Sequence, residues 1–273
     1  MKGPGKMIKA DIHTHTSFST DSDTPMEDMI QAAVGLGLET LCFTEHMDKD
    51  YPVEGAFLLD TDPYMEKFLE LKDKYEGKIR LLFGVELGLL PHLADWHASY
   101  VNQYPFDHII GSEHNPKNRD PYYPSFFEGR TEQEAYTEYF EETMKNLEVF
   151  SDFDSLGHMD YVVRYGPNTN KEYSYKKYSR VIDPILEFIV DKGIALEVNA
   201  GGYKKGLGEP NPCKDIILRY KEIGGELVTI GSDAHSPEFL CYDFPRIEAL
   251  LLDCGFKYHT VFIGRKPELY PLG

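Results

Sequence analysis

The chain has 273 residues, 41% of them hydrophobic, and a formal net charge of −18. This length and apolar content allow a large buried core, whereas the negative charge excludes long-range attraction to DNA or RNA, which requires clustered Lys and Arg. Because no apolar run approaches the roughly 20 residues that cross a bilayer and no signal peptide begins the sequence, we expect a cytoplasmic protein without a membrane partner.

The first predicted element is a short apolar strand over residues 8–12, which leads into His13 and His15. Residues two apart on a strand project to the same face, so both imidazoles can bind one cation. Asp11 is a candidate for orienting one of them. A lone His-x-His pair is common, so this metal hypothesis depends on the rest of the chain. Residues 1–6 are expected to be a leader or an expression remnant.

A helix is predicted next, because Thr24 can cap it, Pro25 suits its first position and Glu27 can close a capping box. Its apolar residues recur at helical spacing. The following strand, over residues 40–43, runs directly into Thr44-Glu45-His46. The first two strands therefore both end in metal-ligand residue types.

The same order of elements then repeats along the chain. Further strands are predicted at 79–85, 108–110, 154–156, 194–198 and 227–230, and each leads directly into polar residues. Helices are predicted between them at 62–75, 92–102, 132–150, 182–191 and 213–223. A helix near 245–252 and a strand near 258–263 close the chain.

Seven apolar strands that alternate with helices predict parallel β/α units, and a closed or distorted α/β barrel is the natural architecture at this length. Active sites of such barrels lie at the carboxyl ends of the strands, where the polar residues of this chain also fall. An open doubly wound sheet would need a phosphate-binding Gly loop after its first strand, and residues 11–17 contain no glycine. We expect one domain over residues 7–273.

The strand ends and the loops after them carry nine candidate metal ligands. They are His13, His15, Asp21, His46, Glu86, His114, His158, Asp233 and His235. Zinc and manganese sites usually take three or four protein ligands, so nine indicate two or three ions that share a bridging carboxylate. Four other histidines lie outside the pattern and are expected on the surface or in the core: His92, His97, His108 and His259.

In these motifs the chain resembles the PHP (polymerase and histidinol phosphatase) superfamily, and within it the histidinol-phosphate phosphatases. The resemblance covers nearly the whole chain from Met7. It rests on the ordered set Asp-Ile-His-Thr-His-Thr at 11–16, Thr-Glu-His at 44–46, Gly-Val-Glu at 84–86, Gly-Ser-Glu-His at 111–114, Leu-Gly-His-Met-Asp at 156–160 and Gly-Ser-Asp-Ala-His at 231–235. It implies the distorted seven-stranded TIM-like barrel of that superfamily.

The resemblance also implies how the ligands divide among divalent ions of zinc, manganese or iron. The first ion would have His13, His15, Glu86 and Asp233, and the second Glu86, His114 and His158, with Glu86 as the bridge. The third would have Asp21, His46 and His235. Several PHP phosphoesterases have a histidine in place of Asp21, which leaves the third ion open.

The chemistry expected of such a site is in-line attack of activated water on a phosphate monoester. Arg164 is predicted to bind the phosphate, because a planar guanidinium matches phosphate oxygens. Asp160, Glu113 and Glu45 are unranked candidates for the acid that protonates the leaving group, and Asp160 could equally orient a ligand histidine. The Tyr-rich stretch at 161–178 is expected to cover the site.

The function expected from the resemblance is hydrolysis of L-histidinol phosphate in histidine biosynthesis. One alternative is a PHP phosphoesterase for another small monoester or a nucleotide. A second is an amidohydrolase-type C–N hydrolase, although that type usually has a carbamylated Lys where this chain has Glu86. A third is a structural scaffold, which would have no reason to keep nine such groups together. The oligomeric state is left open.

Overall fold

The frame of the protein is a parallel sheet of seven strands that lie side by side in the order of the sequence. The computed structural model describes residues 8–273, so the predicted leader at residues 1–6 lies outside the described part. The strands are β1 (Ala10–Thr14), β2 (Thr40–Met47), β3 (Arg80–Gly88), β4 (His108–Ser112), β5 (Ser155–Leu156), β6 (Ala195–Asn199) and β7 (Val228–Gly231).

The sheet curves into a nearly closed barrel, because its two edge strands meet just beyond the end of β7. Thr14 forms a parallel bridge with Ala234, and the backbone N–H of His15 donates to the carbonyl of Ala234 at 2.9 Å. The N–H of Asp233 donates in turn to the carbonyl of His13 at 2.9 Å. The predicted α/β barrel is therefore confirmed, and its point of closure lies at three predicted ligands.

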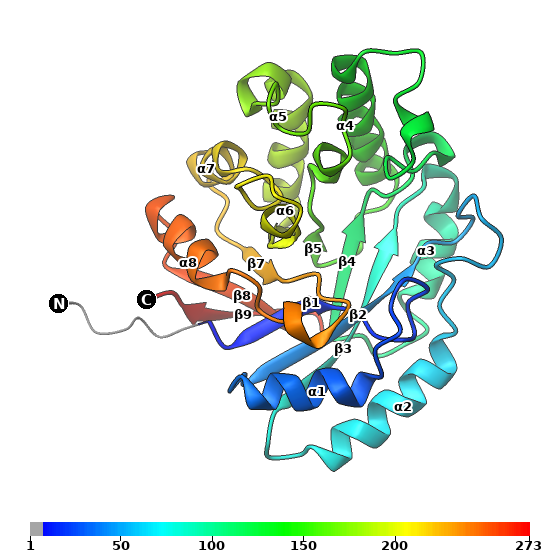
Figure 1. The fold of residues 1–273 in the computed structure, drawn as a ribbon, viewed down its shortest axis with the longest axis vertical. Helices are drawn as coiled ribbons and strands as arrows, with labels where there is room; N and C mark the ends of the chain where they lie inside the picture. Colours follow the sequence, from blue (N-terminus) through cyan, green and yellow to red (C-terminus); the bar gives the residue numbers. More distant parts are fainter. Residues whose placement is uncertain (1–7) are drawn as a thin grey trace.

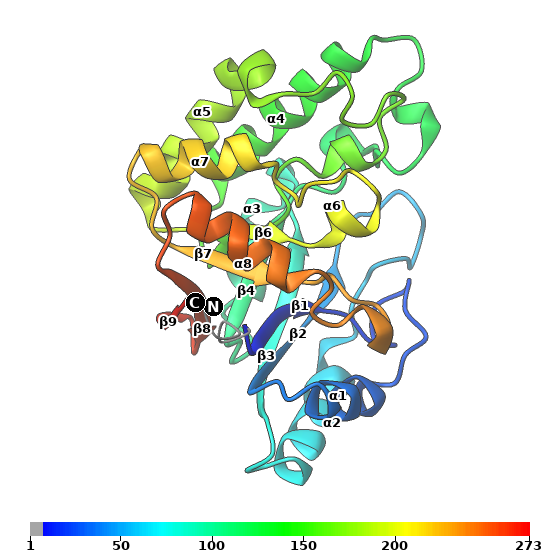
Figure 2. The ribbon, with the colours of Figure 1, turned by 60° about the vertical axis from the view of Figure 1, so that its left-hand side comes forward.

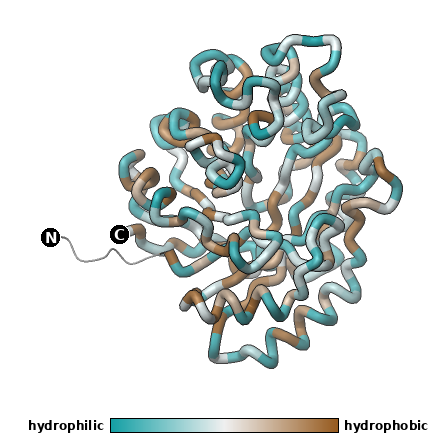
Figure 3. Tube along the Cα trace, in the orientation of Figure 1, coloured by the Kyte–Doolittle hydropathy of each residue, from teal (hydrophilic) through white to brown (hydrophobic). Residues whose placement is uncertain are grey.

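Helices surround the strands (Figures 1 and 2). They are α1 (Met26–Gly35), α2 (Thr61–Lys74), α3 (Ala94–Tyr100), α4 (Glu132–Val149), α5 (Tyr175–Lys192), α6 (Gly201–Lys204), α7 (Lys214–Glu222) and α8 (Phe244–Asp253). Apolar and hydrophilic segments alternate along the helices in Figure 3, as expected where one side of a helix packs on a sheet. Among residues 8–273, every helix is too short or too polar to cross a bilayer.

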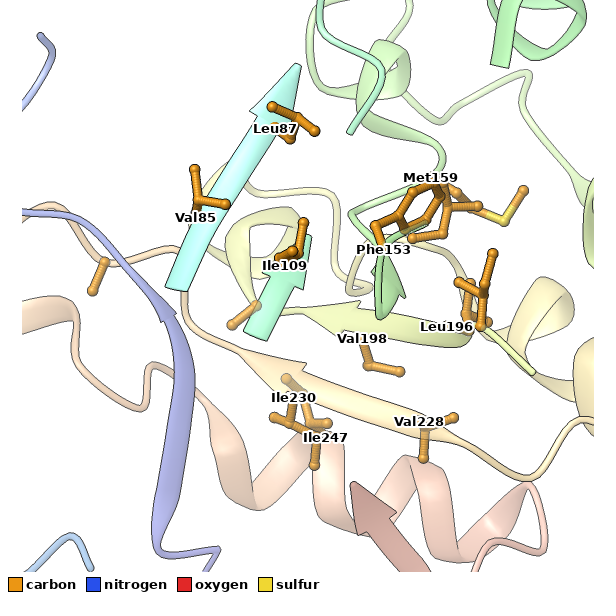
Figure 4. Close-up of a cluster of buried hydrophobic side chains, with 14 of the residues drawn as sticks. Val85, Leu87, Ile109, Phe153, Met159, Leu196, Val198, Val228, Ile230 and Ile247 are labelled. Atoms are coloured by element: carbon orange, nitrogen blue, oxygen red, sulfur yellow. The ribbon is translucent and has the colours of Figure 1, made fainter. Parts of the chain in front are cut away.

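The core lies between the strands and the surrounding helices. Figure 4 shows part of it, in which Ile230 of β7 and Ile247 of α8 lie together, and both side chains are fully buried. Phe153, Leu87 of β3 and Ile109 of β4 belong to the same buried cluster. Burial of such a side chain contributes about 1.5 to 3 kcal/mol to the stability of the fold, so this packing holds the helices against the strands.

Three local expectations differ from the structure. The predicted capping box of α1 is wrong: its N-cap is Pro25, and the hydroxyl of Thr24 donates instead to the carbonyl of His235 at 2.9 Å. Helix α5 begins seven residues earlier than predicted, because Ser174 caps it by accepting from the N–H of Lys177. The predicted strand β8 (Tyr258–Ile263) pairs with β9 (Lys266–Pro271) in an antiparallel hairpin, and β9 was not predicted.

Close packing of the strands gives a first prediction. A Cβ on Gly84 of β3 would lie 2.8 Å from the carbonyl oxygens of Phe43 and His108. We expect Gly84→Ala to lower the free energy of unfolding by roughly 1–3 kcal/mol, because the backbones of β2 and β4 must move apart. Urea unfolding measures the change.

The control is Gly35→Ala in α1, where an added Cβ has no neighbour within 4 Å. This variant should unfold at the same urea concentration as the original protein or a higher one, because Ala favours helix over Gly. Equal stability of the two variants would contradict the packing argument.

Candidate metal centre

The carboxyl ends of the strands bring the nine predicted ligands to one end of the barrel. Four groups of three ligand residues have their ligand atoms within 4.8 Å of one another. The groups are His13, His15 and Asp233; His13, Glu86 and His158; His46, Glu86 and His114; and His15, His46 and His235. Asp21 joins them from the loop after β1, since its Oδ2 lies 3.0 Å from Nε2 of His235.

Glu86, near the end of β3, lies at the centre of this cluster and is fully buried. Its Oε2 faces three imidazole nitrogens at 3.1 to 3.4 Å, those of His13, His15 and His46. Its Oε1 faces two others at 2.8 and 3.1 Å, those of His158 and His114. Each carboxylate oxygen thus has its own set of imidazole neighbours. A carboxylate that bridges two metal ions needs this arrangement.

The first predicted set is completed by Asp233. Its Oδ1 lies 3.7 Å from Nε2 of His13 and 3.5 Å from Nε2 of His15. The two imidazole nitrogens lie 3.1 Å apart, so both point toward the same small volume. The side chains of the first predicted set therefore converge on one point.

The third predicted set lies next to the first. The ring of His15 stacks on those of His46 and His235, with centroids 4.2 and 4.3 Å apart. The Nε2 of His46 lies 3.7 Å from Asp21, whereas its Nδ1 faces Glu86 at 3.1 Å. The ring of His46 thus faces two of the predicted sets at once.

These residues fit divalent metal ions. Nδ1 of His46 and Nε2 of His235 are buried and lie close to Glu86 and Asp21 without the geometry of a hydrogen bond, although buried polar atoms normally have a partner. Burial disfavours protonation of His13, but the carboxylates of Glu197, Glu86 and Asp233 outweigh it and raise the pKa of His13 well above its usual value. So much negative charge around imidazoles calls for cations, and this mixture of nitrogen and oxygen atoms suits zinc, manganese or iron.

Two carboxylates that the sequence analysis missed orient the ligand histidines. Glu197 of β6 lies 2.5 Å from Nδ1 of His13 through Oε1, and its Oε2 accepts from the N–H of His158 at 2.7 Å. Asp48 lies 2.7 Å from Nδ1 of His114. The contacts at Nδ1 of His13 and His114 leave Nε2 of each ring facing Glu86. The one available signal for Glu197 was a charged residue inside an otherwise apolar strand.

The expected orienting role of Asp11 is wrong. Its carboxylate accepts from the backbone N–H groups of Ser232 and Cys241 at 3.0 and 2.9 Å, so it ties the segment after β7 to β1. Burial raises the pKa of Asp11 to about 6. This side chain supports the closure of the barrel, and Glu197 contacts His13 in its place.

Arg164 lies in the wall of a cavity of about 480 Å³ that opens over the cluster. Three side-chain acceptors hold its guanidinium: Asp233 at 3.0 Å, Asn199 at 2.8 Å and Asn211 at 2.8 Å. Lys204, at the end of α6, lines the same cavity. Positive charge is thus concentrated beside the ligand cluster in a strongly acidic chain.

None of the three candidate acids lines this cavity. Asp160 accepts from Asn211 Nδ2 at 2.6 Å and from the N–H of Cys213 at 3.1 Å, and burial raises its pKa to about 6. Glu113 accepts from Asn146, and burial raises its pKa to about 8. Glu45 accepts from Thr16 and Ser19. The predicted role of Asp160 as the catalytic acid thus has no contact with the cavity behind it, because its carboxylate is held by Asn211 and Cys213.

The other expectations have mixed outcomes. Tyr161 and Tyr165 of the Tyr-rich stretch line the cavity, whereas Tyr178 packs in the core. The four histidines outside the pattern also lie outside the described ligand groups. His92 is exposed and contacts Asp50, and the other three are buried: His97, His108 and His259.

Comparison with known proteins places these features in a family. Residues 11–201 match the PHP domain model. A probable histidinol-phosphatase of Clostridium acetobutylicum is 34% identical, over 95% of this chain and 98% of that protein. The histidinol-phosphatase of Lactococcus lactis is 29% identical, over 95% and 96%. A crystal structure of the Lactococcus lactis histidinol phosphate phosphatase, complexed with zinc, L-histidinol and phosphate, aligns over 95% of this chain and 98% of that one, with a TM-score of 0.89.

The contact between Glu197 and His13 gives the second prediction. Glu197→Gln keeps the shape of the side chain but removes the charge that orients the ligand. We expect zinc affinity to fall roughly 10- to 100-fold, measured by competition with a chromophoric chelator. Glu187→Gln on α5 removes an exposed carboxylate and should leave the affinity unchanged. Equal affinity of both variants would show that Glu197 does not act on the metal centre.

Proposed function

The chain belongs to the PHP domain family, and from that premise we propose that it is a histidinol-phosphatase, which hydrolyses L-histidinol phosphate to L-histidinol and phosphate. The observation that carries this proposal is the clustering of the nine imidazoles and carboxylates, with Glu86 at their centre, next to a cavity that Arg164 lines. Relatives aligned over nearly the whole chain have the same name. We further propose that residues 7–273 form one catalytic domain that works in the cytoplasm.

We propose two or three divalent ions, of zinc, manganese or iron. The first would be held by His13, His15, Glu86 and Asp233, the second by Glu86, His114 and His158, and the third by Asp21, His46 and His235. Bound ions of this kind lower the pKa of water and neutralise charge on phosphoryl oxygens. The rest of the site is built from side chains of this chain.

Arg164 is the residue that we propose to bind the phosphate group. Its guanidinium has five N–H donors in a planar fork, and three of its nitrogens already donate to acceptors within the protein. These contacts fix the plane of the fork, and the remaining N–H donors can bind phosphoryl oxygens. Because Asp233 touches both Arg164 and the first ligand set, a phosphate at the cluster would lie beside Arg164.

The role that we propose for Asp160 differs from the predicted one, in which it would protonate the leaving group. Asp160 does not line the cavity, but it contacts Asn211, which contacts Arg164. We therefore regard Asp160 as a positioning residue for Arg164. Glu113 and Glu45 are likewise oriented by neighbouring side chains and do not line the cavity.

The third prediction tests the activity itself. Zinc-loaded protein should release phosphate from L-histidinol phosphate with a kcat/KM roughly a hundredfold above that for other monoesters, since the site must also recognise the alcohol half. A chelator should abolish release, and added zinc should restore it. A clear preference for another monoester or a nucleotide would replace the proposed substrate, and hydrolysis of amides alone would refute a phosphatase.

The fourth prediction concerns Arg164. Arg164→Ala should lower kcat/KM roughly 10²- to 10³-fold, because a fixed charge that contacts the phosphoryl oxygens is lost. Arg164→Lys should recover only part of the activity, since an ammonium lacks the planar fork. Arg180→Ala, on the exposed side of α5, is the matched control. Zinc content is measured for every variant, and unchanged kinetics in Arg164→Ala with full zinc occupancy would remove Arg164 from the site.

A further inference from the structure

A row of aromatic rings leads from the ligand cluster to the mouth of the cavity. The ring of His158 lies 5.1 Å from that of Tyr161, which lies 5.1 Å from that of Tyr165. Tyr165 contacts Tyr122 at 5.5 Å, and Tyr122 is 57% exposed. We call Tyr161, Tyr165 and Tyr122 the aromatic wall. All three line the cavity, so a flat ring can pack against them at a distance from the cluster.

Asp120 lies where the aromatic wall meets the mouth. Its Oδ2 accepts from the hydroxyl of Tyr51 at 2.8 Å, and its Oδ1 accepts from the N–H of Tyr122 at 2.7 Å. These two bonds fix the carboxylate from two different loops. Each oxygen keeps a free lone pair, so the carboxylate can accept further hydrogen bonds from a bound molecule.

Four carboxylates line the cavity, and Asp120 differs from the other three. Asp21, Asp48 and Asp233 each lie within 4.0 Å of an imidazole or guanidinium nitrogen. In the described residues 8–273, no Lys, Arg or His nitrogen comes that close to Asp120. Burial raises the pKa of Asp120, although the hydrogen bonds from Tyr122 and Tyr51 and the charge of His114 oppose this rise. A cationic ligand would supply the missing charge.

The positive groups of the cavity come from other segments than Asp120, although Arg164 and Lys205 each lie 5.2 Å from a ring centroid of the aromatic wall, those of Tyr161 and Tyr165. Arg164 follows β5, and Lys204 and Lys205 follow β6, whereas Asp120 belongs to the loop after β4. The cavity thus offers cations for a phosphate and, on another segment, an anion beside aromatic rings. A substrate that suits it has a phosphate at one end and a flat, positively charged group at the other.

We propose that Asp120 is a specificity residue that accepts a hydrogen bond from the imidazole ring of the substrate while this ring packs on the aromatic wall. The inference rests on the proposed function, because L-histidinol phosphate is the ester that has such a ring. Its amino group is attached next to the ester carbon and therefore lies near the phosphate, whereas the ring lies at the far end. The ring rather than the amino group is thus the part that reaches Asp120.

The test compares Asp120→Asn with the original enzyme, both loaded with zinc, on three esters. These are L-histidinol phosphate, imidazolylpropyl phosphate, which lacks the amino group, and alaninol phosphate, which lacks the ring. We expect kcat/KM to fall roughly 10- to 100-fold for the two esters that have the ring, mainly through KM. The fall should be at least several-fold smaller for alaninol phosphate. Asp50→Asn, which removes an exposed charge next to Tyr51, is the control and should match the original enzyme on all three esters.

The outcomes separate the two proposals. Equal losses on all three esters would overturn the role of Asp120, and so would losses that follow the amino group instead of the ring. In either case the original enzyme still releases phosphate and the proposed function stands. If the original enzyme releases phosphate from none of the esters, the proposed function fails and the role of Asp120 fails with it.

Discussion

The structure depends on the charge gathered around Glu86. A fully buried carboxylate would normally be protonated or paired, and here five imidazoles surround it. Burial favours the neutral acid, but these neighbours, His13 and His114 foremost, hold the pKa of Glu86 well below its usual range. The carboxylate is therefore ionised at the centre of the ligand cluster. No single strand can supply such an environment, so the site exists only when the barrel is closed.

The contacts that close the barrel are consequently also contacts that position the ligand cluster. The backbone contacts that join β1 to the end of β7 involve His13, His15 and Asp233, and all three also belong to the ligand cluster. Gly231 shows how tightly this seam is packed, because a Cβ there would lie 2.3 Å from Cβ of His13 and 2.7 Å from Glu197. Glycine at this position leaves room for the contact between His13 and Glu197. Gly231, which looks like part of a turn in the sequence, thus preserves the orientation of His13, a predicted metal ligand.

The features that could be predicted from the sequence are those that depend on the local pattern of apolar and polar residues. Apolar strands that end in ligand-type residues are visible without a partner, and parallel packing then brings their ends together. Contacts between distant strands have no such pattern. Glu197 meets His13 across 184 residues, and only an unexpected charge in a strand hinted at it. Asp120 was missed because its contacts with Tyr51 and Tyr122 join two loops. Loops have no regular sequence pattern from which such contacts can be predicted. Thr24 was misread because its hydroxyl has a tertiary partner, the carbonyl of His235.

Asp160 shows why closeness in sequence misleads. It lies two residues after His158, which suggested a direct role, but the 3₁₀ turn Tyr161–Arg164 follows it and points Arg164, rather than Asp160, into the cavity. The carboxylate still contacts Asn211, which in turn contacts Arg164. Because it accepts from Nδ2 of that amide, the carbonyl oxygen of Asn211 must face Nε of Arg164. The segment 160–164 therefore supplies both Arg164 and Asp160, and Asp160 sets the orientation of the Asn211 amide that accepts from Arg164. These contacts fix the plane of Arg164 within the protein, so the phosphate binding that we propose for it would cost little conformational entropy.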